Sequence, residues 1–92
     1  MTVSFYATLR PLVGAKTLDF PLPDGATLRA LLQRIVERFP ALGPKLLAED
    51  GELARGIHVF VNGRGAGYLP EGLDTRVAPA DVIDVFPAVA GG

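Results

Sequence analysis

Residues 27–40, Thr-Leu-Arg-Ala-Leu-Leu-Gln-Arg-Ile-Val-Glu-Arg-Phe-Pro, carry the strongest periodic pattern in this chain of 92 residues. Apolar side chains recur there at helical spacing, at Leu28, Leu31, Leu32, Ile35, Val36 and Phe39. This spacing predicts a helix near residues 27–39 with one apolar stripe, in which Thr27 is the N-cap and Pro40 lies just past the end. Arg29 is expected on the solvated side. The apolar stripe must be buried against another layer, which the rest of the chain has to supply.

That second layer is predicted to be a β-sheet. Apolar and polar residues alternate in four segments, near residues 2–10, 16–22, 57–62 and 82–87. The first two are expected to form an opening hairpin, where Pro21 suits an edge strand because it donates no ladder hydrogen bond. The dipeptide Asn62-Gly63 predicts a tight turn. The order of elements predicts an α+β fold, a mixed sheet of four to five strands packed on one main helix.

Composition limits the classes of protein to which the chain can belong. Hydrophobic residues make up 49% of the sequence and charged residues 21%, which indicates a folded domain rather than a disordered chain. Nine Lys and Arg against ten Asp and Glu argue against a nucleic-acid partner. The sequence contains no apolar run of about 18 residues and no signal-peptide pattern at its start, so we expect no membrane association and a cytoplasmic location.

Few residues are suited to catalysis or metal binding. The chain has no cysteine and one histidine, His58, which excludes a thiol nucleophile and leaves little scope for a metal site. His58 lies within a predicted strand, and no G-x-S-x-G motif accompanies it. Asp81 and Asp84 fall on opposite faces of a strand, so they form a poor pair of carboxylates. The domain is expected to be a poor catalyst by itself.

The last residues of the sequence offer a different kind of chemistry. Gly91-Gly92 follow closely after Pro87, which ends the last predicted strand. An arm without Cβ atoms enters a narrow channel and adopts backbone angles closed to other residues. A terminal carboxylate is ionised at pH 7 and is therefore a poor electrophile. Its activation needs a leaving group, for which an acyl-adenylate formed from ATP is the obvious choice.

An ordered set of motifs resembles a known family over essentially the whole chain. The matching segments are Phe5-Tyr6-Ala7-Thr8-Leu9-Arg10, the helix from Thr27, Val59-Phe60-Val61-Asn62-Gly63, Asp81–Pro87 and Val89-Ala90-Gly91-Gly92. Together they resemble the MoaD/ThiS family of ubiquitin-like sulfur carriers, and within it MoaD, the small subunit of molybdopterin synthase. The resemblance implies a β-grasp domain at residues 1–87 and a flexible tail at residues 88–92.

The resemblance also implies a function for the tail. In this family an adenylating enzyme of the MoeB/ThiF type activates the terminal glycine, here Gly92, with ATP and magnesium that the partner uses and this chain does not bind. A persulfide enzyme then supplies sulfur, which converts the adenylate to a thiocarboxylate. The tail, with Gly91, Ala90 and Val89 giving access, inserts into a MoaE-type large subunit, where the sulfur enters molybdopterin of the molybdenum cofactor.

Other members of the family leave the pathway open. The loop from Gly63 to Leu73 and the ending Val-Ala-Gly-Gly also resemble CysO-type carriers, which serve cysteine synthesis, and ThiS-like or tRNA-thiolation carriers are further alternatives. A ubiquitin-like modifier that joins Gly92 to lysines uses the same adenylate. A binding-only adaptor with a passive tail is the third class. The family's usual Gly-Asp is Ala80-Asp81 here and its common Pro-Pro is Pro87-Ala88.

Strand parity predicts a surface for a partner. If the aliphatic residues of the strands face the helix, then Tyr6, Phe60 and Phe86 share the opposite face of the sheet, and such an apolar patch marks an interaction site. Arg10 is expected to pair with acidic groups of a partner around the tail. The alternatives are a sheet face partly covered by the loop from Gly63 to Leu73, and a merely solvated Arg10.

Overall fold

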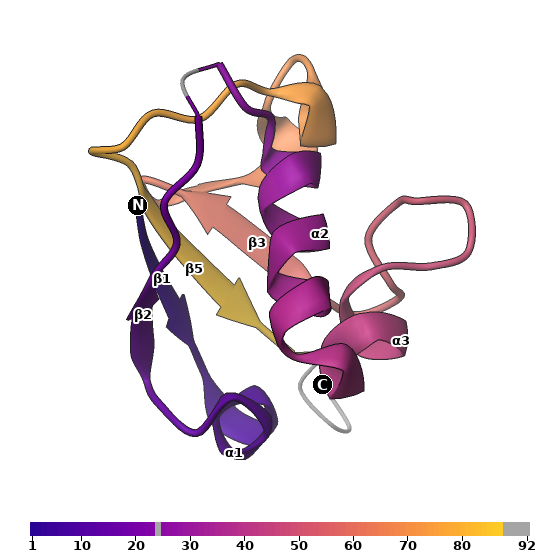
Figure 1. Ribbon diagram of the computed structural model, residues 1–92. Coiled ribbons are helices and arrows are strands. Elements are labelled where there is room, and N and C mark those ends of the chain that lie inside the picture. Colours follow the sequence, from indigo (N-terminus) through magenta and orange to yellow (C-terminus); the bar gives the residue numbers. More distant parts are fainter. Residues whose placement is uncertain (24, 88–92) are drawn as a thin grey trace.

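A computed structural model describes residues 1–23 and 25–87 as one mixed sheet with helices on one of its faces (Figure 1). The strands are β1 Thr2–Phe5, β2 Thr17–Asp19, β3 His58–Val61, β4 Arg64–Gly65 and β5 Val82–Phe86. The α-helices are α1 Arg10–Val13, α2 Leu28–Arg38 and α3 Gly43–Leu46. The 3-10 turns are Ala7–Leu9, Pro40–Leu42, Ala66–Tyr68 and Gly72–Asp74. No helix in the described ranges has both the length and the apolar character needed to cross a membrane.

The sheet runs in the order β2-β1-β5-β3-β4, so β5 lies at its centre. The pairing of β1 with β5 is parallel and places Val3 opposite Ile83 and Phe5 opposite Val85. The three other pairings are antiparallel. This arrangement confirms the predicted mixed sheet, and α2 is the main helix that packs on it.

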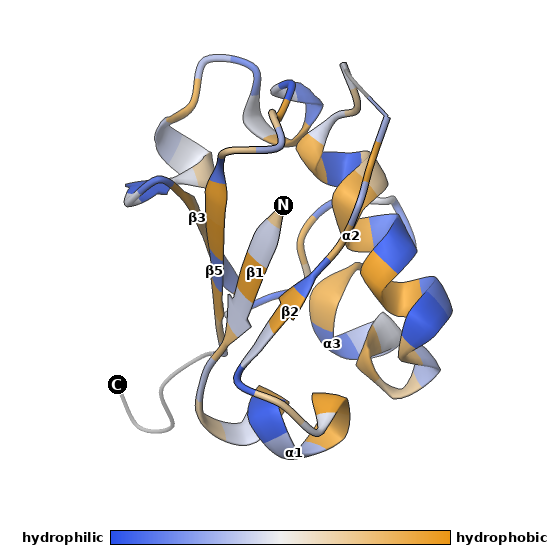
Figure 2. Cartoon of the chain, turned by 60° about the vertical axis from the view of Figure 1, so that its left-hand side comes forward, coloured by the Kyte–Doolittle hydropathy of each residue, from blue (hydrophilic) through white to orange (hydrophobic). Residues whose placement is uncertain are grey.

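The helix α2 begins and ends as its sequence predicts. The Thr27 hydroxyl accepts a hydrogen bond from the backbone N–H of Ala30 at 3.1 Å, which is an N-cap. The apolar stripe of α2 belongs to one core cluster with the inner residues of the sheet. Figure 2 shows hydrophobic positions, in orange, along both α2 and the strands. The fully buried residues of the core include Val3, Phe5, Leu28, Leu31, Leu32, Ile35, Val59, Ile83 and Val85. One face of the sheet and one stripe of the helix therefore form the core.

The first predicted strand is wrong beyond Phe5. Alternation of apolar and polar residues continues to Leu9, but the strand stops because Ala7 takes a left-handed backbone conformation, with φ of 52°. A 3-10 turn then brings Leu9 into the core at 1% exposure. Burial of Leu9 thus comes from a helical turn, which period-two reasoning mistakes for a strand.

The second predicted strand is shorter than residues 16–22, although the antiparallel hairpin is confirmed. Only β2, Thr17–Asp19, pairs with β1, and it is an edge strand. Single backbone hydrogen bonds continue the contact on both sides, from Phe5 N–H to Lys16 at 2.7 Å and from Phe20 N–H to Met1 at 2.9 Å. Pro21 lies beyond the ladder, because the register that pairs Thr2 with Asp19 already brings Phe20 to Met1, the first residue.

Arg29 is not simply solvated, contrary to expectation. Its guanidinium forms ion pairs with Glu52 at 2.7 Å and Asp74 at 3.3 Å, and it donates a hydrogen bond to the carbonyl of Gly51. These partners raise the pKa of Arg29, with the hydrogen bond to Glu52 as the largest cause. The Arg29 side chain thereby links α2 to the turn at Gly51 and Glu52 and to the 3-10 turn that ends at Asp74.

A second side-chain link holds the start of β5. Asn62, in the turn between β3 and β4, donates to the Asp81 carboxylate at 2.9 Å and accepts from the backbone N–H of Val82 at 2.8 Å. The other Asp81 oxygen accepts from Ala78 N–H at 2.7 Å. Asn62 has φ of 51° and Gly63 φ of 84°, the left-handed pair of a tight hairpin turn. Two turns that are distant in sequence are thus joined.

We predict that Asp81→Ala lowers the free energy of unfolding by about 1 kcal/mol, because two hydrogen bonds to its carboxylate are lost. Urea denaturation measures this change. Glu37→Gln, at an exposed position of α2, is the control and should leave stability within about 0.5 kcal/mol of the parent. If both variants unfold at the same urea concentration, the Asn62–Asp81 link does not stabilise the fold.

Candidate functional site

The outer face of the sheet, away from α2, carries the aromatic residues that strand parity predicts. Figure 2 shows α2 and α3 together on the opposite side. Phe60 on β3 and Phe86 on β5 point outward because their neighbours Val59 and Val85 point into the core. Tyr6, the residue after β1, is placed beside Phe86 because Phe5 pairs with Val85. All three rings are only partly buried.

The ring of Phe86 contacts both of the other rings. Tyr6 stacks on Phe86 with 4.1 Å between ring centroids and 10° between planes. Phe60 meets Phe86 edge-on, at 5.4 Å and 89°. Both geometries are favourable aromatic pairings. We call Tyr6, Phe60 and Phe86 the aromatic surface.

A hydrogen bond fixes the Tyr6 side of this surface. The Tyr6 hydroxyl donates to the Asp84 carboxylate at 2.9 Å. This hydrogen bond is the main reason why the pKa of Tyr6 lies above its ordinary value of 10.0, and the negative charge of Asp84 adds to the effect. Arg10 Nε donates to the carbonyl of Phe5 at 3.2 Å, and its guanidinium lies 6.0 Å from the Tyr6 ring centroid. Arg10 therefore belongs to the same neighbourhood.

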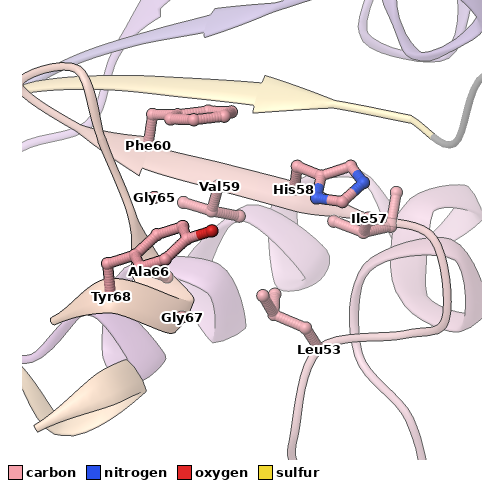
Figure 3. A pocket seen from close by; sticks show the side chains of 9 residues that line it. All are labelled: Leu53, Ile57, His58, Val59, Phe60, Gly65, Ala66, Gly67 and Tyr68. Atoms are coloured by element: carbon pink, nitrogen blue, oxygen red, sulfur yellow. The ribbon is translucent and has the colours of Figure 1, made fainter.

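The aromatic surface continues toward the edge of the sheet. A Cβ atom on Gly65 would lie 3.3 Å from Tyr68 and 3.6 Å from Phe60, so both rings lie over this glycine. Tyr68 is 87% exposed. Beside it is a hollow of about 250 Å³, in which side chains from β3 and from loops on either side meet (Figure 3). Its lining includes Leu53, Ile57 and Val59.

A second hollow lies on the outer face at the end of β5. It has a volume of about 570 Å³ and is lined by His58, Phe60, Gly63, Asp84, Phe86 and Pro87. Pro87 is the last described residue. The predicted reactive residue Gly92 and the access residues Val89, Ala90 and Gly91 lie outside the described residues. Because Pro87 lines this hollow, the hollow is the described part of the site that leads to these residues along the chain.

The structure brings the predicted partner residues Tyr6, Phe60, Phe86 and Arg10 into one neighbourhood. Their role in binding a partner stays a prediction. Sequence reasoning did not place Asp84 and Tyr68 beside the aromatic surface, where the structure has them. Asp84 has the same strand parity as Phe86, a signal that places it on the outer face. Tyr68 follows a glycine-rich segment without periodic pattern, so the sequence does not indicate on which face of the sheet it lies.

Comparison with protein families gives a match to the ThiS family over residues 3–92. The chain belongs to the ThiS family. The match spans the sheet, the helix and the final glycines together, as the motif order in the sequence indicates.

Curated relatives of this ThiS-family chain have similar length. It is 35% identical over 92 residues to small archaeal modifier protein 3 of Haloferax volcanii, which covers 100% of this chain and 98% of the relative. It is 30% identical over 95 residues to the sulfur carrier protein CysO of Mycobacterium tuberculosis, with 100% and 98% covered.

Solved structures show the same fold. Small archaeal modifier protein 1 of Haloferax volcanii matches with a TM-score of 0.86 and 32% identity, over 100% of this chain and 98% of that one. CysO in the BexX/CysO complex of Amycolatopsis orientalis gives 0.82 and 32%, over 99% and 98%. A molybdopterin converting factor subunit 1 of Pyrococcus furiosus gives 0.77 and 30%, over 96% and 95%. The fold is therefore the ubiquitin-like β-grasp, as the resemblance implies.

We predict that Tyr6 titrates above pH 10 and that Asp84→Asn moves its titration down toward the ordinary value. The chain has two tyrosines and no tryptophan, so ultraviolet absorbance of a Tyr68→Phe variant follows Tyr6 alone. Because the folded-state pKa is raised, the hydrogen bond stabilises the fold below pH 10 and this contribution is lost as the pH rises through the folded-state pKa. A Tyr6 midpoint that is the same with and without Asp84 contradicts the prediction.

Proposed function

We propose that this ThiS-family chain is a sulfur carrier, and that the carboxylate of Gly92 is adenylated and then converted to a thiocarboxylate. The observation that carries the proposal is the family match through residue 92 on a chain with no cysteine. Because the chain has no cysteine thiol, sulfur has to be attached to it through another group. An activated terminal carboxylate is such a group.

The chemistry divides between the carrier and its partners. A carboxylate oxygen of Gly92 attacks the α-phosphorus of ATP, and pyrophosphate leaves. The terminal sulfur of a persulfide enzyme then attacks the acyl carbon and expels AMP. Cleavage of the remaining S–S bond by a thiol leaves the thiocarboxylate. ATP and magnesium are held by a MoeB/ThiF-type adenylating enzyme. This chain contributes the glycine arm and a surface for docking.

The aromatic surface is the proposed docking face for that enzyme. Tyr6, Phe60 and Phe86 are partly exposed, and β5 leads directly from Phe86 through Pro87 to the terminal residues. A partner that covers Phe86 therefore lies close to the start of the arm. Rigid placement of the domain matters because a misplacement of about 1 Å at a reacting atom can slow a reaction about 100-fold.

The destination of the sulfur is proposed to be the dithiolene of molybdopterin, which is built from a cyclic pyranopterin precursor in a MoaE-type large subunit. The similarity to the molybdopterin converting factor subunit of Pyrococcus furiosus supports this destination. Similarity to CysO supports cysteine synthesis as the alternative destination. Genes beside this one separate the two: a large-subunit gene favours molybdopterin, and a cysteine-synthase-like gene favours cysteine.

Protein modification is the second candidate function. It is favoured by the similarity to small archaeal modifier proteins 1 and 3. The two functions share the adenylate and differ in the attacking atom, a lysine nitrogen instead of a persulfide sulfur. Arg76 is the last tryptic site of the chain, so a conjugate leaves the peptide 77–92 on the modified lysine. Mass spectrometry of cell digests detects that branch.

We predict that adding one residue after Gly92 abolishes thiocarboxylate formation, and that Gly91→Ala slows it, because the arm overshoots the ATP site or becomes thicker and stiffer. The assay combines the chain with the adenylating enzyme, ATP, magnesium and a persulfide donor. Intact mass then reports replacement of oxygen by sulfur. Sulfur transfer to an extended chain, or to one lacking Gly92, rules out the proposed function.

We predict that Phe86→Ala weakens binding to the adenylating enzyme about 30-fold, since truncation of a central aromatic residue in an interface removes about 2 kcal/mol. Calorimetry gives the dissociation constant and thermal unfolding gives the midpoint. Val36→Ala is the matched control, because Val36 is also a partly buried apolar residue but lies on α2, which packs on the other face of the sheet. Unchanged binding with a lowered midpoint assigns Phe86 to the core instead.

A further inference from the structure

Asp84 places a negative charge within the aromatic surface. On β5 it lies between the outward-facing residues Val82 and Phe86, and across the sheet it pairs with Phe60 on β3 and Ser4 on β1. Its side chain is partly buried. The hollow that it lines with Phe60, Phe86 and Pro87 is mostly apolar. A carboxylate at this position is unfavourable for a docking face that is otherwise apolar, unless a partner provides a group that pairs with it.

The described part of the chain gives this carboxylate one hydrogen bond and no ion pair. The bond comes from the Tyr6 hydroxyl and goes to Oδ1. A carboxylate accepts about four hydrogen bonds in all. Arg10, whose guanidinium lies 6.0 Å from the Tyr6 ring centroid, directs its Nε to the carbonyl of Phe5. His58 lines the same hollow, and its strand partner is Phe86 rather than Asp84. Because the side chain is only partly buried, the remaining acceptor sites of the carboxylate are open to solvent while the face is free.

Docking of a partner on the aromatic surface removes that water. A buried charge without a partner is strongly unfavourable, whereas a hydrogen-bonded ion pair inside an interface is tolerated or favourable. A protein that binds here by apolar contact alone therefore leaves Asp84 desolvated and unpaired. The partner has to supply a donor with a positive charge at this point.

We propose that the protein partner of this surface inserts an arginine side chain into the hollow lined by Phe60, Phe86 and Pro87, where its guanidinium pairs with Asp84. The hollow combines a carboxylate with aromatic rings, and a planar guanidinium pairs with the first while it packs on the second. A lysine ammonium offers a point charge without that flat face. The inference rests on the proposed function, in which an adenylating enzyme covers this surface.

Asp84→Asn is the test, because it keeps the shape of the side chain and an oxygen for the Tyr6 hydroxyl but removes the charge. The control is Glu37→Gln, which makes the same change of net charge on the exposed side of α2. Binding of each variant to the MoeB/ThiF-type adenylating enzyme from the same organism is measured by calorimetry at low and high NaCl. Thermal midpoints confirm that both variants are folded.

We expect Asp84→Asn to raise the dissociation constant about 30-fold or more and to weaken its dependence on NaCl, while Glu37→Gln changes it less than about twofold. Alanine substitution of surface arginines on the enzyme then identifies one that weakens binding of the parent chain but not of Asp84→Asn. Equal binding of parent and Asp84→Asn, or coupling of Asp84 to no arginine, overturns the inference. Failure of the parent chain to be adenylated contradicts the proposed function instead, so the two failures are distinguishable.

Discussion

The parallel pairing of β1 with β5 is the constraint on which the rest of the structure depends. It joins the first strand of the chain to the last at the centre of the sheet, with Phe5 opposite Val85. A slip of one residue would turn every side chain of β5 to the other face. The observed register places Val85 in the core and, one step further along, sets Tyr6 against Phe86. Core packing and the aromatic surface are thus two results of one register.

The two faces of the sheet have different roles. The inner face packs on α2, and a domain of 92 residues needs that core for its stability. The outer face carries three contacting rings, an exposed Tyr68 and the carboxylate of Asp84, and β5 leads from it toward the terminal glycines. Links at Arg29 and at Asn62–Asp81 hold loops and the start of β5 in place. A folded body with a recognisable face, followed in the sequence by two terminal glycines, suits the proposed carrier, whose chemistry occurs in the active site of another protein.

Periodic segments of this fold are predictable from the sequence, and segments governed by single backbone conformations are not. The helix α2 and its N-cap at Thr27 are predictable, because apolar residues recur at helical spacing over the whole segment. β3 and β5 follow from alternation, and their parity places Phe60 and Phe86 on one face. The same rule fails after Phe5, because Ala7 takes a left-handed conformation that an alanine in the sequence does not indicate. The Asp81 link escapes prediction because it depends on how two distant turns meet, and Asp84 matters only once Tyr6 is known to lie beside it.

The proposed function requires that this β-grasp protein carries sulfur on the carboxylate of Gly92. The most direct measurement is the intact mass of the chain purified from its own cells under conditions that preserve thiocarboxylates. Sulfur transfer to Gly92 predicts a population that ends at Gly92 and has one oxygen replaced by sulfur. This population disappears when the gene for the adenylating enzyme is deleted. A chain found only as the free carboxylate, or only as conjugates on lysine, contradicts the proposed role as a sulfur carrier.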